Sequence, residues 1–188
     1  MDLSDRRHIA APPDRVWAAL MDPEVLKDCI PGCSELTGSP EAGFDAVVTQ
    51  KVGPVKATFR GRVEIPERDP PHHATLEGSG KGGPAGFARG RATIRLAPDA
   101  GGTILAYDVG AEVGGKLAQL GSRIVDAFAK RMAEQFFARF QEIVETDAPA
   151  TGPATGPERA TEEAVIAADA AGTADAAGRK GWFGRLFG

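Results

Sequence analysis

The sequence has little of what marks several protein classes. It has 188 residues but only two cysteines, three histidines and 6% aromatic residues. Two cysteines cannot form a disulfide framework, so we expect a reducing, cytoplasmic compartment. No apolar run approaches the ~20 residues of a transmembrane helix. No apolar stretch follows the charged first residues, so we also expect no secretory signal. The net charge of −4 argues against nucleic acid as a main partner.

Composition divides the chain into three segments, which we predict to be its domains. Residues 1–146 contain nearly all of the large apolar side chains and form a folded body. Residues 147–178 consist mainly of Ala, Gly, Thr and Pro, with six acidic residues and one basic residue. Such a segment cannot bury enough apolar surface to offset the entropy of ordering, which predicts a disordered acidic linker. Residues 179–188 are basic and aromatic again.

Hydropathy within the body has two periods. From about residue 33 to residue 113 apolar residues alternate with polar ones, most clearly over Val55–Ile65, which predicts antiparallel strands joined by short turns. From about Lys116 to Glu145 apolar residues recur every three or four positions, which predicts a helix about 45 Å long. A one-sided sheet and a one-sided helix must bury against each other. The expected fold is therefore α+β, with a curved antiparallel sheet wrapped around a long C-terminal helix.

The inward positions of the predicted sheet are unusually small. On the strand that starts at Gly86, one face reads Gly86, Ala88, Gly90 and Ala92. Two explanations stand side by side: the small residues allow the sheet to curve, or they leave an apolar cavity for a flat ligand. In a cavity the Tyr107 hydroxyl would orient the ligand, whereas in an ordinary core the same side chains would only pack. The candidate pocket residues are Val48, Phe59, Leu76, Leu105, Tyr107, Leu117, Leu120, Ile124 and Phe128.

Several motifs together resemble one known family. Cys29-Ile30-Pro31-Gly32-Cys33 and Gly114-Gly115-Lys116-Leu117-Ala118, with Val52-Gly53-Pro54-Val55, are similar to the CoxG-like family, that of the G subunit of carbon monoxide dehydrogenase, over residues 3–145. That family belongs to the START-like (SRPBCC) helix-grip superfamily. The resemblance implies a helix-grip fold with a hydrophobic cavity and no covalent cofactor. It also implies a quinone as the bound small molecule, and a molybdenum hydroxylase of the carbon monoxide dehydrogenase type as partner at the cytoplasmic membrane. Arg6-Arg7-His8 departs from the family, which usually has an aromatic or aliphatic residue there.

The cysteine pair, a glycine-rich run and a row of arginines also have plain structural explanations. Cys29 and Cys33 lack the four ligands that a zinc site needs, so we expect them to be structural. Gly78–Gly83 matches G-x-G-x-x-G, but a strand follows it instead of a helix, so we interpret it as a hairpin turn. A row of outward-facing arginines indicates either a solvated sheet face or a docking surface for an acidic partner subunit. These arginines are Arg60, Arg62, Arg89, Arg91 and Arg95.

The last ten residues have the pattern of an interfacial anchor. Four large apolar side chains fall on one helical face, and three basic residues flank them, as in segments that bind an anionic membrane surface. We therefore expect a peripheral protein on the inner face of the cell membrane, with a helix-in-groove contact to a partner protein as the alternative. The anchor residues are Arg179, Lys180, Trp182, Phe183, Arg185, Leu186 and Phe187.

The sequence as a whole favours a non-enzymatic accessory protein. It would bind a hydrophobic ligand and tether a molybdenum hydroxylase to the membrane. One alternative is an assembly or recruitment factor without a ligand. A second alternative is a helix-grip cyclase or hydrolase, which would need polar groups that converge inside the cavity.

Overall fold

A computed structural model describes residues 1–146 of the chain. The predicted linker, 147–178, and the predicted anchor, 179–188, lie outside the described residues. The strands are β1 (Asp2–Ile9), β2 (Cys33–Ser39), β3 (Gly43–Val52), β4 (Val55–Asp69), β5 (His73–Lys81), β6 (Phe87–Asp99) and β7 (Gly102–Gly114). The helices are α1 (Pro13–Leu20), α2 (Pro23–Cys29) and α3 (Ser122–Thr146), and the short 3-10 turns are η1 (Gly83–Ala85) and η2 (Ala118–Leu120).

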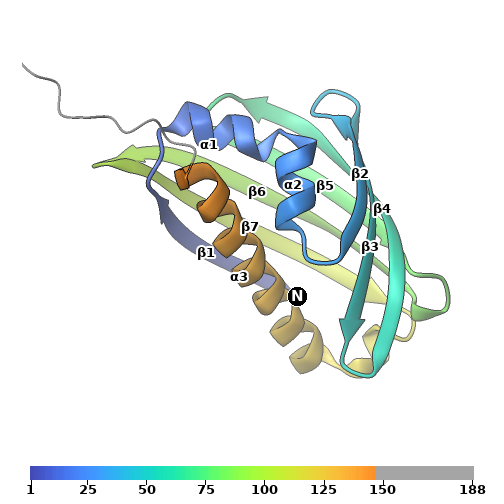
Figure 1. Cartoon of the computed structure of the whole chain (residues 1–188). Helices are drawn as coiled ribbons and strands as arrows, with labels where there is room; N and C mark the ends of the chain where they lie inside the picture. The colour runs from blue at the N-terminus through green and yellow to red at the C-terminus, as the bar shows by residue number, and fades with distance from the viewer. Residues whose placement is uncertain (147–188) are drawn as a thin grey trace, which may run out of the picture. The chain divides into compact units, whose positions relative to one another are not determined.

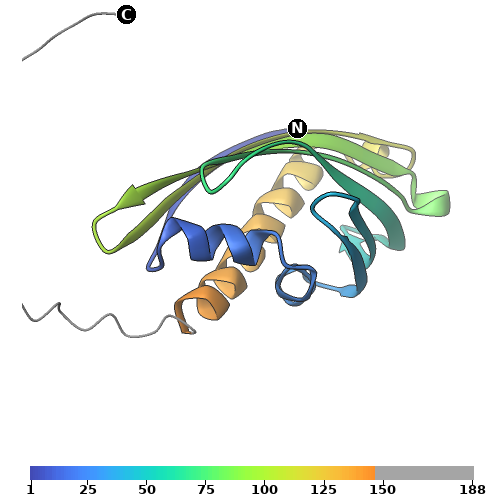
Figure 2. The same ribbon diagram turned by 90° about the horizontal axis from the view of Figure 1, so that it is seen from above.

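The seven strands form one antiparallel sheet in the order β1-β7-β6-β5-β4-β3-β2. The sheet arches over α3, and α1 and α2 lie on the same side of it as α3 (Figures 1 and 2). The predicted α+β fold, a curved antiparallel sheet around a long C-terminal helix, is confirmed. None of the helices in residues 1–146 is both long and apolar enough to cross a membrane.

The long helix begins later than the sequence pattern predicts. We expected it from about Lys116, but α3 starts at Ser122, after η2 and Gly121. Gly121 has a φ of +83°, a left-handed conformation that an α-helix cannot contain. Gly115 also has a positive φ, and a Cβ atom there would lie 2.6 Å from the Cα of Gly86. The backbone of this connection therefore packs closely on η1 before α3 begins.

The filled core lies at the end of the sheet that α1 and α2 cover. Ile9, Val16, Leu105 and Phe140 are fully buried there, which joins β1, α1, β7 and α3 in one cluster. Hydrogen bonds tie the same elements together: the Thr103 hydroxyl donates to the Ala11 carbonyl at 2.7 Å. This end of the molecule is close-packed and leaves no room for a ligand at Leu105.

Farther along the sheet, α3 covers the inner face only in part. Alternation places one face of each strand toward α3, but many of these side chains are half-buried instead of buried. Examples from four strands are Phe59, Leu76, Ala92 and Val109. The inner face therefore changes along the strands from a sealed core to a partly open apolar surface.

The inward glycines of the sheet are of two kinds. A Cβ atom on Gly90 would lie 2.5 Å from the Gly110 carbonyl oxygen, so this glycine permits a close approach of two strands. Gly78 and Gly80 are different, because a Cβ atom there would meet nothing nearer than 3.5 Å and 3.7 Å, respectively. Close strand approach thus requires glycine at the first position, whereas the inner face has room for a side chain at the other two.

Candidate functional site

A cavity of about 260 Å³ lies between the inner face of the sheet and α3. Its walls come from β1, β6, β7, α3 and the loop after α2, and the surface that they turn toward the cavity is entirely apolar. The lining residues are Leu3, Ile30, Pro31, Ala92, Ile94, Tyr107, Val109, Met132, Ala133, Phe136 and Phe137. An apolar molecule is the kind of ligand that such walls favour.

Strand register and helix period bring these residues together. Ala92 pairs with Val109, and Ile94 pairs with Tyr107, so four inward side chains form a block on β6 and β7. On α3, Met132, Ala133, Phe136 and Phe137 share one face because they are spaced by three or four residues. Alanine at positions 92 and 133 leaves the space that larger side chains would fill.

Aromatic rings form one wall of the cavity. The rings of Tyr107 and Phe137 are stacked with centroids 4.8 Å apart and an interplanar angle of 20°. Phe136 meets Phe137 edge-on at 5.1 Å, and it stacks on Phe140 at 5.9 Å. Each ring is held by its neighbours in a preferred aromatic geometry. A flat ligand would therefore find a rigid, flat wall.

An ion pair stands behind this wall on β1. Alternation turns Leu3, Asp5 and Arg7 toward α3. The Arg7 guanidinium lies 5.4 Å from the centre of the Phe137 ring, and its Nη2 atom lies 3.1 Å from the Asp5 carboxylate. The Arg7 Nε atom is buried and has no hydrogen-bond partner. The Arg7 guanidinium is thus held against the aromatic wall, and its Nε–H group has no acceptor.

The same pair acts on the tyrosine of the cavity. Burial raises the pKa of Tyr107, and the charge of Asp5 raises it further, while the charge and hydrogen bond of Arg7 lower it in part. The net direction is upward, so the Tyr107 hydroxyl keeps its proton at neutral pH. A neutral phenol that accepts a hydrogen bond from Arg7 still has its own O–H to donate.

The predicted pocket residues occupy three different environments. Tyr107 lines the cavity, whereas Leu105 is fully buried in the core and Leu117 is buried near the start of α3. Ile124 is 40% exposed, and the other predicted residues are outside the cavity walls. These other residues are Val48, Phe59, Leu76, Leu120 and Phe128. Contact between these residues and a ligand stays a prediction.

Asp5 and Arg7, which contact the aromatic wall from behind, were not selected by the sequence reasoning. The signal was present, because Leu3, Asp5, Arg7 and Ile9 alternate on one face of a strand that ends in a buried isoleucine. The departure from the family at residues 6–8 indicated only an altered cavity edge. The predicted anchor residues 179–188 lie outside the residues that the structure describes.

Both cysteines are free thiols. Cys29 is only 2% exposed, and burial raises its pKa to about 11. Burial also raises the pKa of Cys33, and its thiol donates to the Glu35 carbonyl at 3.3 Å. Within residues 1–146 no group of three or more His, Cys, Asp or Glu side chains could hold a metal ion. Cys29 thus packs in the hydrophobic core, whereas the Cys33 thiol is hydrogen-bonded at the start of β2.

Cys29 should therefore react very slowly with thiol reagents in the folded protein. With a pKa of about 11, about one thiol in a thousand is ionised at pH 8, against about a quarter for a free cysteine with a pKa of ~8.5. In a Cys33→Ser variant, reaction of Cys29 with dithionitrobenzoate should be more than ~100-fold slower in buffer than in denaturant. Similar rates in the two conditions would show that Cys29 is accessible and ionised.

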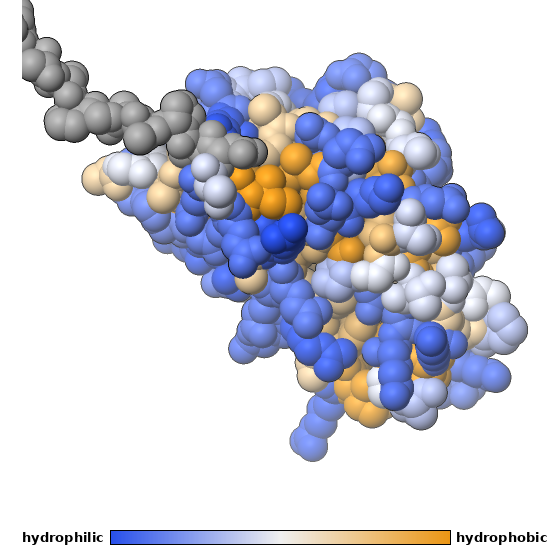
Figure 3. All heavy atoms as spheres, viewed as in Figure 1, coloured by the Kyte–Doolittle hydropathy of each residue, from blue (hydrophilic) through white to orange (hydrophobic). Residues whose placement is uncertain are grey.

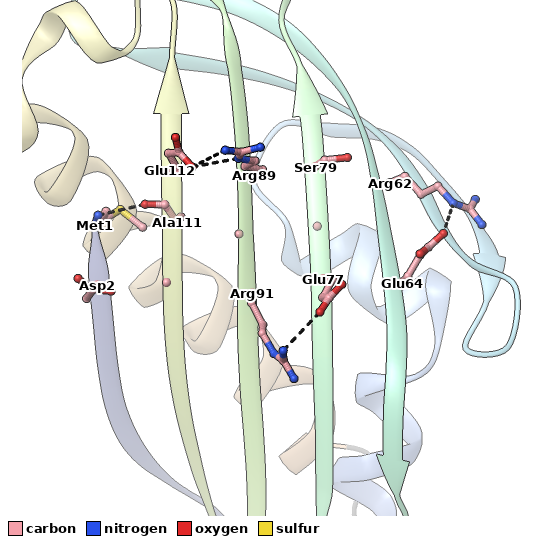
Figure 4. Close-up of a pocket in the computed structure, with 13 residues that line it drawn as sticks. Met1, Asp2, Arg62, Glu64, Glu77, Ser79, Arg89, Arg91, Ala111 and Glu112 are labelled. Atoms are coloured by element: carbon pink, nitrogen blue, oxygen red, sulfur yellow. Dashed lines mark hydrogen bonds and ion pairs between the residues drawn. The ribbon is translucent and has the colours of Figure 1, made fainter.

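The outer face of the sheet has a larger hollow of about 710 Å³, but charged side chains surround it (Figure 4). Arg89 contacts Glu112 at 2.8 Å, and Arg91 contacts Glu77 at 3.5 Å. Arg62 contacts Glu64 at 3.0 Å, and Arg95 contacts Asp108 at 3.0 Å. Four of the five arginines of the predicted basic row are thus paired with acids. This part of the face is a solvated mosaic of both charges and not a positive stripe.

The glycine-rich run Gly78–Gly83 is not a dinucleotide site. It covers the end of β5 and the start of η1, and strand β6 follows. No helix of eight residues or more begins after this run and before β6 in the described chain, so the helix N-terminus that would hold a pyrophosphate is missing. The prediction of a hairpin connection is confirmed.

Comparisons with known proteins agree with this architecture. A conserved protein from Geobacillus kaustophilus has a solved structure that matches with a TM-score of 0.72 and 32% identity, over 78% of this chain and 96% of that chain. Proteins from Rhizobium leguminosarum and Thermus thermophilus match at 18% identity with TM-scores of 0.61 and 0.60. The former covers 78% of this chain and 95% of its own, and the latter 79% and 100%. At that identity they show the fold alone.

Sequence comparison decides the family. No match was found among curated protein sequences. The family model for the G subunit of carbon monoxide dehydrogenase (CoxG) matches residues 6–145, which include all of β2–β7 and nearly all of α3. The chain therefore belongs to the CoxG family of carbon monoxide dehydrogenase G subunits.

Proposed function

We propose that this chain is a non-enzymatic accessory protein that holds a quinone-like molecule for a molybdenum hydroxylase of the carbon monoxide dehydrogenase type. Membership of the CoxG family implies an accessory role to carbon monoxide dehydrogenase. The observation that carries the ligand part of the proposal is the apolar cavity of about 260 Å³ between the sheet and α3. Electrons that leave such an enzyme need a lipid-soluble acceptor, which links the cavity to the partner.

The cavity chemistry supports a flat ring with an oxygen acceptor. The stacked Tyr107 and Phe137 rings offer a flat apolar surface. The Tyr107 hydroxyl keeps its proton beside Arg7, and we expect it to turn toward a bound ligand and donate to a carbonyl oxygen. A quinone presents both a flat ring and carbonyl oxygens. The volume is just below the range of about 300–1,000 Å³ for drug-sized ligands, so the cavity suits the ring, and an apolar tail would extend along the half-buried inner face.

The membrane part of the proposal rests on residues 179–188. Trp182, Phe183, Leu186 and Phe187 have the spacing of one helical face, and three basic residues flank them. Aromatic side chains favour the headgroup boundary, and basic side chains favour anionic lipid. Such a segment would attach the protein reversibly to the cytoplasmic face of the membrane, whose acyl interior dissolves quinones.

Lipid extraction tests the ligand proposal directly. The full chain, purified from membranes in mild conditions, should contain a quinone in near-stoichiometric amount by mass spectrometry. Tyr107→Phe removes one hydrogen bond and should lower the affinity for added quinone by about tenfold. Absence of any lipid would favour a ligand-free assembly factor. Turnover of an aromatic substrate that is lost in Tyr107→Phe would favour an enzyme.

Liposome flotation tests the anchor separately. The full chain should float with anionic liposomes to a clearly greater extent than a chain that ends at Gly178. Equal flotation of the two chains would remove residues 179–188 from the membrane proposal, and it would leave the ligand proposal untouched.

A further inference from the structure

One end of the sheet carries an uncompensated positive charge. The turns at this end are residues 53–54, residues 82–86 and the β7–α3 connection, which lie together at the lower right of Figure 1. We call it the basic end and define it by its cations, Lys51, Lys56, Arg60, Lys81, Lys116 and Arg123. None of these six takes part in an ion pair with another described residue. The turns at the opposite end of the strands carry Glu41, Asp69 and Asp99 instead.

Strand register makes this charge hard to explain by folding alone. Lys51 is paired directly across from Lys56, and Arg60 is paired across from Lys81. Like charges in such positions destabilise a sheet. In the middle of the same face the pattern is the opposite, because Arg89 is paired with Glu112. The sheet thus tolerates two repulsive pairs at the basic end, which indicates an anionic partner outside the fold.

Exposed apolar side chains accompany these cations. Phe87 and Ile124 are 41% and 40% exposed, and they are the exposed large hydrophobic residues of residues 1–146. Phe87 is the register partner of Lys81. Ile124 lies over the β3–β4 turn, where its Cγ2 atom would be 3.5 Å from a Cβ atom on Gly53. Figure 3 shows hydrophobic surface at the lower end of this view, over the start of α3 and the β3–β4 turn.

We propose that the basic end is a docking surface for an anionic lipid bilayer, in addition to the C-terminal anchor. Cations with long flexible stems around isolated apolar tips suit the headgroup layer, where the ammonium groups meet lipid phosphates and the apolar tips enter the acyl boundary. The acids near these six cations are Asp126 on α3, Glu112 on β7, which Arg89 holds, and Glu35 on β2, which lines the same hollow as Arg60 and Lys81. Positive charge therefore prevails at the surface that meets the membrane.

This orientation would place the open part of the inner face against the lipid. Between the basic end and the cavity, the inward positions of β6 and β7 are Ala88, Gly90, Ala111 and Val113, and all four are half-buried. They form an inner-face path from the basic end to Ala92 and Val109 of the cavity wall, whereas Phe87 lies on the outer face. An apolar molecule could pass between bilayer and cavity along this path without crossing water. This consequence rests on the proposed ligand function, whereas the docking itself does not.

The test uses the full chain with a silenced tail, Trp182→Ala/Phe183→Ala/Leu186→Ala/Phe187→Ala, so that the anchor and the body are separated. In low salt this chain should still bind vesicles of equal parts phosphatidylglycerol and phosphatidylcholine, and it should bind pure phosphatidylcholine far more weakly. Each basic residue near an anionic surface is worth a factor of about five in binding. Lys51→Gln/Lys56→Gln should therefore weaken binding by about 10- to 25-fold, and ~1 M salt should abolish it.

The matched control removes two exposed cations elsewhere, Arg6→Gln/Lys130→Gln, and it should weaken binding by less than threefold. Equal losses in the two double variants would reduce the effect to net charge and overturn the proposal. The proposal would also be overturned if the silenced-tail chain showed no preference for the anionic vesicles. Loss of binding to purified partner enzyme in Lys51→Gln/Lys56→Gln, with vesicle binding unchanged, would assign this surface to an acidic protein instead. Binding of the unsilenced chain reports on the anchor in every case.

Discussion

Phenylalanine in place of Ala92 should abolish binding of a cavity ligand while the protein stays folded. Ala92 points inward between Leu76 and Val109, its register partners, and it lines the cavity of about 260 Å³. A benzyl group there would enter the empty volume and occupy the place of the ligand ring. We expect affinity for an added quinone, measured by tryptophan fluorescence or calorimetry, to fall by more than 100-fold. Because aromatic residues suit strands and the space is vacant, the free energy of unfolding should change by less than ~1.5 kcal/mol.

The neighbouring strand offers a matched control for this change. Ala106 lies on the outer face of β7, across from Arg95 and Arg6, so Ala106→Phe adds the same group to the same sheet on the opposite side. Its ligand affinity should stay within about threefold of the unchanged protein. Equal affinity in Ala92→Phe and the unchanged protein would place the ligand outside this cavity. A loss of stability of several kcal/mol in Ala92→Phe would show that the space is already filled.

Most of the fold could be predicted because each element repeats a simple period. Alternation over Val55–Ile65 fixed both the strand and its inward face, and β4 only extends farther, to Asp69. The start of α3 was wrong by six residues, because apolar residues such as Leu117 and Leu120 keep the helical spacing through η2. The positive φ of Gly121 interrupts the helix there. Spacing alone does not distinguish a packed turn from the first turn of a helix.

The site was less predictable because its position depends on which part of the inner sheet face the helices cover completely. Leu105 and Tyr107 have the same parity on β7, yet the first is packed in the core and the second borders the cavity. The difference comes from where α1 and α2 cover the sheet and how α3 crosses it, and periodicity contains neither fact. Phe136 and Phe137 follow the apolar period of the predicted helix, but that period does not show that they border a cavity. Arg7 could have been selected from strand parity.

The helix α3 thus has two separable tasks, and two phenylalanines one turn apart should separate them. Phe140 is fully buried in the core, whereas Phe136 is half-buried and lines the cavity. Phe140→Ala should lower the free energy of unfolding by about 3–5 kcal/mol, because a large buried ring leaves a void that the close-packed end cannot collapse. This is a large share of the ~5–15 kcal/mol that stabilises an ordinary domain. Urea unfolding followed by circular dichroism measures it.

Phe136→Ala should reduce ligand affinity more than it reduces the stability of the fold. Its ring is already partly exposed, so the loss of stability should be about 1–2 kcal/mol, but the aromatic wall against Phe137 is lost and the cavity widens. Ligand affinity should fall by more than tenfold in Phe136→Ala, and it should change by less than threefold in the folded fraction of Phe140→Ala at low temperature. If both variants lost affinity in proportion to their stability, the ligand would depend on the fold as a whole and not on this cavity. If neither lost affinity, the aromatic wall would have no part in binding.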